Sequence, residues 1–194
     1  MNPSLVACVV AFVAGSIPFG MLIARFYGKG DLRKAGSGNI GATNVVRTLG
    51  KTAGILTLLG DGAKGLVAVL LAQAWGHASI LPAVAACVAV LGHMFPLYHS
   101  FRGGKGVATA LGALLPMLPL PLLGGLLVWL VVVVIWRYVS AGSILAALVV
   151  PLLAALWSYP WPLVLAAVLI ALLVLYKHRD NFHRLRRGGE AKFF

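Results

Sequence analysis

Residues 120–136 read LPLLGGLLVWLVVVVIW and contain no charged side chain. Six further stretches of the 194-residue chain are similarly apolar, at residues 5–27, 52–75, 79–95, 106–118, 144–157 and 161–176. The chain is 61% hydrophobic and only 10% charged, with a mean hydropathy of +0.98. Such a composition is typical of integral membrane proteins. We therefore expect an all-α membrane protein with a single domain of about seven transmembrane helices.

The basic residues orient these spans in the membrane. If the N-terminus lies outside, every Lys and Arg except Lys64 falls on the inner side, which is the side where basic residues concentrate. The stretch 106–118 would be only about 20 Å long as a helix, against a hydrocarbon core of about 30 Å. If it did not cross, however, the strongly basic tail would face outward. The sequence therefore predicts seven crossings with a cytoplasmic C-terminus.

The formal net charge of +12 constrains the partners. In a chain this apolar, the excess favours anionic lipid headgroups and phosphate-bearing substrates over nucleic acid. Cys8 and Cys87 lie in apolar spans, so we expect neither a disulfide nor a metal site. Asp61 and Lys64 stand three residues apart in the second span and share a helix face. A structural ion pair is the favoured reading of this pair, with a catalytic role as the alternative.

Two glycine-rich polar stretches interrupt the apolar spans. Residues 36–44 read GSGNIGATN and residues 101–109 read FRGGKGVAT. Glycines let backbone N–H groups approach a ligand closely, and N–H groups beside a helix N-terminus and a cation suit a phosphate. Two separate stretches predict two anion sites. Their candidate ligands are Gly36, Ser37, Gly38, Asn39, Gly41, Thr43, Asn44, Arg47, Gly103, Gly104, Lys105 and Thr109.

The predicted topology places two more polar clusters on the same membrane face, at residues 137–143 and 178–181. Convergence of four polar clusters on one face predicts an active site there. These clusters add Arg137, Ser143, His178 and Asn181 as candidate ligands. We expect the catalytic side chains to be Ser37, Lys105, His178 and Asn181.

Two nucleotide motifs are excluded by their context. The glycines of residues 36–41 fit GxGxxG, but a transmembrane span precedes them where a dinucleotide fold needs a strand. Lys105 is followed by Gly106, whereas a Walker A motif needs Ser or Thr at that position.

A general base is harder to find in this sequence. The chain has four acidic residues and no His-x-x-x-x-Asp pair, which counts against the acid–histidine mechanism of many acyltransferases. His93 and His178 are candidate proton acceptors, and His93 is also a candidate substrate ligand. For His93, a structural role as a helix-end residue has equal support. Since no nucleophile–base pair stands out, we expect no covalent acyl-enzyme.

Three motifs carry a family resemblance: GSGNIGATN at residues 36–44, GHMFPLYHSFRGGKGVAT at residues 92–109 and RYVSAGS at residues 137–143. In this order they resemble the motifs of the bacterial acyl-phosphate:glycerol-3-phosphate acyltransferases. The resemblance implies transfer of a fatty acyl group from acyl phosphate to the 1-hydroxyl of glycerol 3-phosphate. It implies phosphate-binding roles for Ser37, Asn39, Thr43, Arg47, Lys105, Ser143, His178 and Asn181.

The same resemblance implies an enzyme of the bacterial plasma membrane with its active site on the cytoplasmic face. No cofactor and no obligatory protein partner are implied. Because an acyl phosphate is already activated, a substrate phosphate oxygen can take the proton from the attacking hydroxyl, and we hypothesise such substrate-assisted catalysis. A transporter of a phosphorylated anion is the competing class, although it predicts more midplane polar residues and an inverted repeat. A lipid-binding scaffold without chemistry is a third, weaker alternative.

Overall fold

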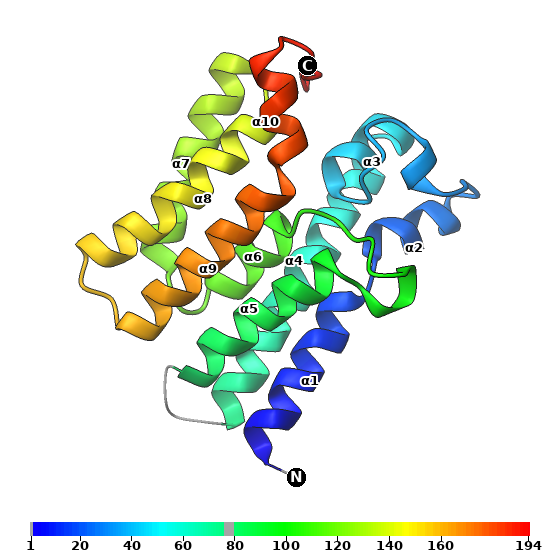
Figure 1. Cartoon of the computed structure of the whole chain (residues 1–194). Helices are drawn as coiled ribbons and strands as arrows, with labels where there is room; N and C mark the ends of the chain where they lie inside the picture. Colours follow the sequence, from blue (N-terminus) through cyan, green and yellow to red (C-terminus); the bar gives the residue numbers. More distant parts are fainter. Residues whose placement is uncertain (1, 76–79) are drawn as a thin grey trace. The chain divides into compact units, whose positions relative to one another are not determined.

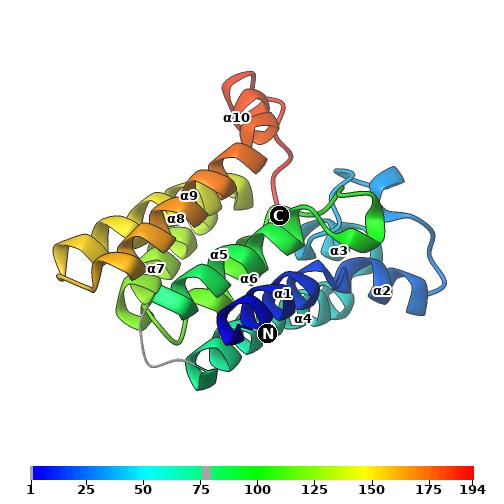
Figure 2. The same ribbon diagram turned by 60° about the horizontal axis from the view of Figure 1, so that its bottom comes forward.

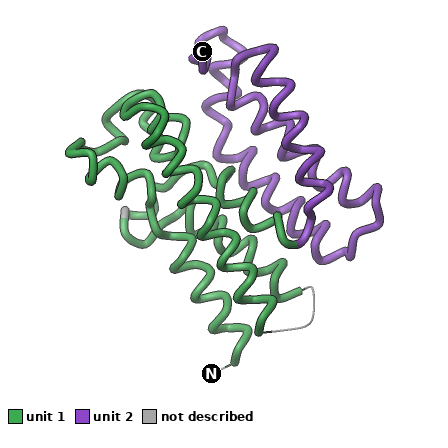
Figure 3. The backbone as a smooth tube through the Cα atoms, turned by 180° about the vertical axis from the view of Figure 1, so that it is seen from behind, with its two compact units in different colours: residues 1–116 green, residues 117–194 purple. Residues whose placement is uncertain are grey.

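The computed structural model describes residues 2–75 and 80–194, and every regular element within these ranges is helical. The chain forms two compact units, residues 1–116 and residues 117–194 (Figure 3). Unit 1 contains α1 (Pro3–Ser16), α2 (Phe19–Phe26), η1 (Leu32–Lys34), α3 (Ala42–Leu49), α4 (Lys51–Trp75), α5 (Ile80–Met94), η2 (Leu97–His99) and α6 (Val107–Leu114). Unit 2 contains α7 (Pro119–Trp136), α8 (Val139–Leu156), α9 (Trp161–Lys177) and α10 (Arg179–Arg186) (Figure 1).

The first apolar span, expected to run unbroken over residues 5–27, is divided into α1 and α2. The break lies at Ile17 and Pro18, because proline has no backbone N–H and its ring clashes with the preceding helical turn. The Ile17 carbonyl accepts a hydrogen bond from Lys64 Nζ at 2.7 Å. Lys64 therefore ties α4 to the break in the first span.

Helix length and composition account for four or five of the seven predicted crossings. The segments long and apolar enough are the α1–α2 pair (Pro3–Phe26), α4, α7 and α8, with a fifth if α9 and α10, bent by 56°, count as one span. α5 has 15 residues and α6 has 8, or about 22 and 12 Å of helix. Both are shorter than the predicted stretches 79–95 and 106–118, and Ser79 itself lies outside the described residues.

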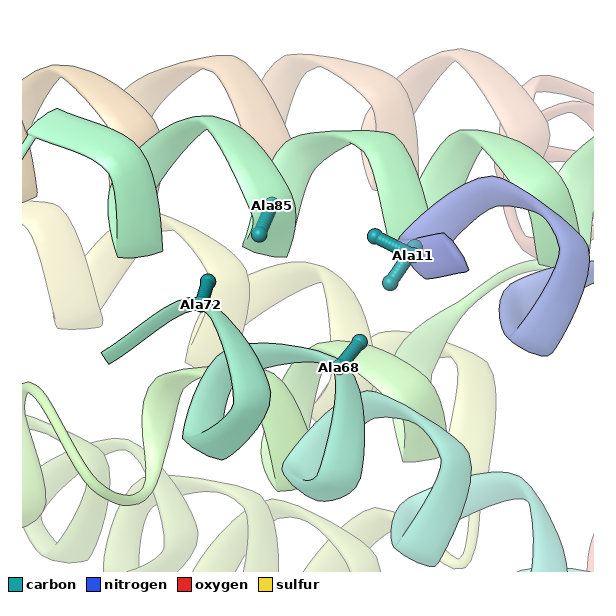
Figure 4. Close-up of a cluster of buried hydrophobic side chains, with 5 residues drawn as sticks. Ala11, Ala68, Ala72 and Ala85 are labelled. Carbon is teal, nitrogen blue, oxygen red and sulfur yellow. The ribbon is translucent and has the colours of Figure 1, made fainter. Parts of the chain in front are cut away.

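Small residues let the helices of unit 1 approach one another closely. A Cβ added at Gly15 of α1 or Gly92 of α5 would collide with the backbone of the other helix. The same holds for Gly65 and Gly112, where α4 meets α6. In a lipid environment, this close packing is a principal source of helix association. Figure 4 shows the alanine cluster that joins α1, α4 and α5, consisting of Ala11, Ala68, Ala72, Ala85 and Ala89.

Unit 2 packs α7 against α8 and α8 against α9, with α10 touching both α8 and α9. Arg137 adopts a left-handed conformation with φ of 62° at the end of α7, which turns the chain sharply. α8 consequently begins at Val139, earlier than the predicted start at residue 144. Ser143 therefore lies within a helix and not in the turn between two helices.

Candidate active site

The first glycine-rich loop of unit 1 is built around the side chain of Asn44. Asn44 Oδ1 accepts a hydrogen bond from the Ser37 N–H at 2.8 Å. Its Nδ2 donates to the carbonyls of Leu32, Ala35 and Asn39 at 3.4, 3.0 and 2.7 Å. Asn44 is 2% exposed, so its amide is buried beneath the loop and fixes the loop backbone through these hydrogen bonds. The sequence predicts Asn44 as a substrate ligand, whereas in the structure its side chain supports the loop internally.

The glycines of this loop are required by its turns. Gly36 and Gly38 have φ of 57° and 72°, in the left-handed region where other residues are strained. A Cβ at Gly36 would also collide with Asn44 Oδ1. Ser37 lies exposed between these two glycines. The loop therefore presents the Ser37 hydroxyl at the surface of unit 1.

The end of the loop leads into the N-terminus of α3. The Gly41 N–H donates to Asn39 Oδ1 at 2.8 Å, and α3 begins at Ala42. Within the described part of the chain, no side chain caps this helix. Thr43 and Arg47 lie four residues apart and so share a face of α3, and Arg47 is exposed. An uncapped helix N-terminus with a cation one turn later is a suitable place for an anion.

The second glycine-rich loop folds back on the C-terminal end of α5. The N–H groups of Gly103 and Gly104 donate to the carbonyls of Met94 and His93, both at 3.2 Å. A Cβ at Gly104 would collide with the His93 imidazole, so the loop needs glycine to sit against that ring. Lys105, partly buried, follows directly. This packing fixes the backbone from which the Lys105 side chain extends.

Asp61 connects the ion pair in α4 with His93 of α5, which packs against the second glycine-rich loop. Its Oδ1 lies 2.8 Å from Lys64 Nζ, which confirms the predicted ion pair, and 3.5 Å from His93 Nδ1. All three side chains are nearly inaccessible to solvent, at 3–4% exposure. The i, i+3 spacing revealed the first contact, whereas nothing in the sequence pointed to the second, between α4 and α5. Through His93, Asp61 supports the second glycine-rich loop.

Figures 1 and 2 show both glycine-rich loops at the end of unit 1 away from the N-terminus. Unit 1 thus brings most of the predicted ligands to one end of a single compact body. Thr109 is the exception among them. It is fully buried in α6 where that helix meets Gly65 of α4, and its hydroxyl has no hydrogen-bond partner among the described residues.

The predicted residues of unit 2 occupy the end where α7 stops, α8 starts and α10 lies (Figure 1). Ser143 Oγ donates to the Val139 carbonyl at 2.9 Å within α8. His178 Nδ1 lies 2.8 Å from the Val174 carbonyl. A carbonyl only accepts, so Nδ1 carries the hydrogen and Nε2 is the nitrogen able to take up a proton.

Asn181 and Arg137 of unit 2 are both held by the C-terminal segment. Asn181 Nδ2 donates to Glu190 Oε1 at 2.6 Å. The Arg137 carbonyl accepts from the Phe193 N–H at 2.8 Å, and its guanidinium lies 5.5 Å from the centre of the Phe194 ring. Sequence reasoning missed this segment, because its contact with Arg137 joins residues far apart along the chain.

Each of the four Asp and Glu side chains lies within 4 Å of a cation. The pairs are Asp31 with Arg33 at 2.6 Å, Asp61 with Lys64 at 2.8 Å, Asp180 with Arg179 at 3.8 Å and Glu190 with Arg184 at 2.7 Å. Hydrogen bonds from the Arg33 side chain and backbone lower the pKa of Asp31 to about 2. A close carboxylate–cation pair keeps a carboxyl ionised and weakly basic, which makes a poor general base. The pair of Asp180 with Arg179 is the loose one, with the Asp180 side chain 70% exposed.

Comparison with known proteins places this site in context. A family model described as glycerol-3-phosphate acyltransferase matches residues 5–188. The glycerol-3-phosphate acyltransferase of Trichlorobacter lovleyi is 50% identical over 183 residues, covering 94% of each chain. That of Geobacter sulfurreducens is 50% identical over 193 residues, covering 100% of this chain and 99% of the relative.

Two crystal structures are also similar, both of PlsY (YgiH), an integral membrane glycerol 3-phosphate acyltransferase. Its glycerol 3-phosphate form has a TM-score of 0.93 at 42% identity, covering 98% of this chain and 96% of that one. Its lysophosphatidic acid form has a TM-score of 0.90 at 40% identity, covering 97% and 94%.

Proposed function

The chain belongs to the family of glycerol-3-phosphate acyltransferases, and from this membership we propose that it uses acyl phosphate as the acyl donor. It is an integral membrane enzyme that acylates glycerol 3-phosphate. In the proposed reaction, the fatty acyl group goes to the 1-hydroxyl of sn-glycerol 3-phosphate. The products are 1-acyl-glycerol 3-phosphate (lysophosphatidic acid) and inorganic phosphate. The reaction contributes to phospholipid biosynthesis.

The close pairing of three of the four acidic side chains with cations is the observation that carries the choice of donor. A donor with a weak leaving group would need a protein base to activate the hydroxyl and an acid to expel the group. Acyl phosphate needs no such acid, since phosphate leaves readily as an anion, and one of its own phosphate oxygens can accept the hydroxyl proton in place of a protein base. The cations and N–H groups of the two glycine-rich loops suit a site whose main task is to bind and orient phosphate groups.

The chemistry proceeds in one transfer step in this proposal. The 1-hydroxyl oxygen attacks the carbonyl carbon of acyl phosphate, and the bond from that carbon to the phosphate oxygen breaks. The hydroxyl proton passes to a phosphate oxygen of the substrate. Arg47 and Lys105 stabilise negative charge on phosphate oxygens. Ser37, Asn39, Thr43, Ser143, His178 and Asn181 supply further hydrogen bonds.

The surroundings of the site follow from the same proposal. The acyl chain lies among the apolar helices and reaches the site from the bilayer, while glycerol 3-phosphate enters from the cytoplasm. The enzyme is placed in the bacterial plasma membrane with its N-terminus outside, and the whole chain serves one activity. No cofactor and no protein partner take part. The glycerol 3-phosphate and lysophosphatidic acid forms of the similar PlsY structures support the assignment of substrate and product.

A comparison of donors tests the proposal. Purified protein would be given glycerol 3-phosphate together with palmitoyl phosphate, palmitoyl-coenzyme A or palmitoyl-acyl carrier protein. We expect lysophosphatidic acid from palmitoyl phosphate. For the other two donors we expect a kcat/KM at least about 100-fold lower, because their acyl group is not bonded to a phosphate that could occupy the second anion site. Comparable kcat/KM with palmitoyl-coenzyme A would show that the donor is misassigned.

A further inference from the structure

Glu190 accepts hydrogen bonds from three side chains at the start of α8 and in α10. Its Oε1 accepts from Ser140 Oγ at 2.7 Å and from Asn181 Nδ2 at 2.6 Å. Its Oε2 accepts from Arg184 Nε at 2.7 Å. The three donors belong to two helices, and Glu190 lies in the segment that follows α10. One carboxylate thereby joins α8, α10 and the C-terminal segment.

This arrangement differs from an ordinary surface ion pair. The Glu190 side chain is 8% exposed and Asn181 is 4% exposed, so the bond between them is largely shielded from water, whereas the Arg184 side chain is 45% exposed. By contrast, Asp180, which precedes Asn181 in α10, is 70% exposed and lies 3.8 Å from Arg179. Exposed pairs of that kind contribute little. A shielded carboxylate with three donors fixes the orientation of each of them.

We propose that Glu190 is a positioning residue for acyl transfer and acts by fixing the amide of Asn181. The inference rests on the proposed substrate-binding role of Asn181. An amide can turn by half a rotation and exchange its NH₂ group with its oxygen. A carboxylate only accepts hydrogen bonds, so Glu190 selects the orientation in which the NH₂ group faces it. The Asn181 amide is therefore held in one orientation before substrate binds.

Pre-orientation of a binding group has a kinetic consequence. If Glu190 no longer selects one orientation of the Asn181 amide, a larger part of the enzyme presents the wrong end of the amide to the substrate. The fraction in the competent orientation then limits apparent affinity. Loss of Glu190 should therefore weaken binding of the same substrate whose binding is weakened by loss of Asn181. Binding of the other substrate should be unaffected. A merely structural role would reduce the active fraction for both substrates alike.

The test is a double-variant cycle on purified enzyme with palmitoyl phosphate and glycerol 3-phosphate. It uses wild type, Asn181→Ala, Glu190→Ala, the double variant, and Glu190→Gln. Asp180→Asn is the matched control, since it removes an exposed carboxylate from α10, next to Asn181. The KM for each substrate, kcat and the thermal unfolding midpoint are measured for all six.

We expect Glu190→Ala to raise, by roughly tenfold, the KM for the same substrate whose KM rises in Asn181→Ala. The other KM should change less than about twofold. In the Asn181→Ala background, removing Glu190 should have no further effect on that KM, because the positioned group is gone. Glu190→Gln should recover most of the loss, because its amide oxygen can still accept from Asn181. Asp180→Asn should behave as wild type.

Several results would overturn the inference. One is a Glu190→Ala enzyme with the same KM values as Asp180→Asn, and another is independent, multiplying effects of Glu190→Ala and Asn181→Ala. Unchanged KM values in Asn181→Ala would also reject it, while leaving the proposed reaction standing. If Glu190→Ala does not fold, the cycle is run with Glu190→Leu, which keeps much of the side-chain volume and has no acceptor for Asn181, and a KM increase shared equally by both substrates would reject positioning. Failure of wild type to use palmitoyl phosphate would instead reject the proposed function.

Discussion

Arg47 on α3 and Lys105 in the second glycine-rich loop are the cations that we assign to substrate phosphate. Asn44 fixes the first loop, which leads into α3, and hydrogen bonds to the end of α5 fix the second loop. A cation on a fixed backbone pays less conformational entropy when it binds an anion than one on a free chain. Their removal should therefore affect catalysis more than folding.

Lys105→Ala and Arg47→Ala should each lose a charge-assisted hydrogen bond worth about 1.5–3 kcal/mol. This corresponds to a fall in kcat/KM of roughly 10- to 200-fold. Lys34→Ala is the matched control, because Lys34 is an exposed cation of unit 1 just before the first glycine-rich loop. A folded, membrane-inserted Lys105→Ala enzyme with wild-type kcat/KM would mean that the second loop does not bind phosphate.

Asp61 has a structural role, and its removal should lower the free energy of unfolding. Asp61→Ala leaves Lys64 as an unpaired charge in a buried place, with a cost of about 3–5 kcal/mol in the free energy of unfolding. The double variant Asp61→Ala/Lys64→Met removes both charges and should recover part of that loss, although the Ile17 carbonyl then loses its donor. Thermal unfolding in detergent measures both effects. If the single variant were as stable as wild type, the ion pair would have no structural role.

At the scale of elements, the C-terminal segment is held to α8 and α10 by a group that titrates. Burial by itself would raise the pKa of Glu190, but hydrogen bonds from Ser140, Asn181 and Arg184, with the charge of Arg184, bring it below its ordinary value of 4.5. A carboxyl whose pKa is lowered by folding stabilises the fold fully above its unfolded pKa. That stabilisation is lost as the pH falls through the lower, folded-state pKa.

The unfolding midpoint of wild type should therefore exceed that of Glu190→Gln at pH 7, and the difference should shrink below about pH 4.5, the unfolded value. Asp180→Asn should differ little from wild type at either pH, since its carboxylate is exposed. Thermal scans of the three proteins from pH 7 to pH 3.5 provide the comparison. A difference between wild type and Glu190→Gln that grows toward low pH would contradict the contact geometry.

The elements themselves were largely predictable from the sequence, because long apolar runs in a membrane protein must be helical to satisfy their backbone groups. The break at Pro18 was missed, since the prediction followed hydropathy and gave too little weight to the missing N–H of proline. Local spacing also gave the Asp61–Lys64 pair. The Asp61–His93 contact and the bond from Ser140 to Glu190, 50 residues apart, were beyond prediction because they depend on how helices pack.

For the whole molecule, the proposed topology makes a direct prediction about accessibility. Single cysteines would be placed at Ser158, Lys34 or Gly189 in a Cys8→Ala/Cys87→Ala background, all three positions being exposed. In intact cells, an impermeant thiol reagent should label the cysteine at 158 from outside and should leave 34 and 189 unlabelled until the membrane is opened. Labelling of 189 from outside would overturn the model of seven crossings with a cytoplasmic C-terminus.

Acyl transfer between two phosphate-bearing substrates is the central claim, and the balance of its products tests it most directly. Purified enzyme would be incubated with palmitoyl phosphate and glycerol 3-phosphate, and both products followed in the same sample by ³¹P NMR. We predict one lysophosphatidic acid for each inorganic phosphate released, with neither formed at an appreciable rate when glycerol 3-phosphate is omitted. Release of phosphate at an unchanged rate without glycerol 3-phosphate, or the absence of lysophosphatidic acid in its presence, would contradict the claim.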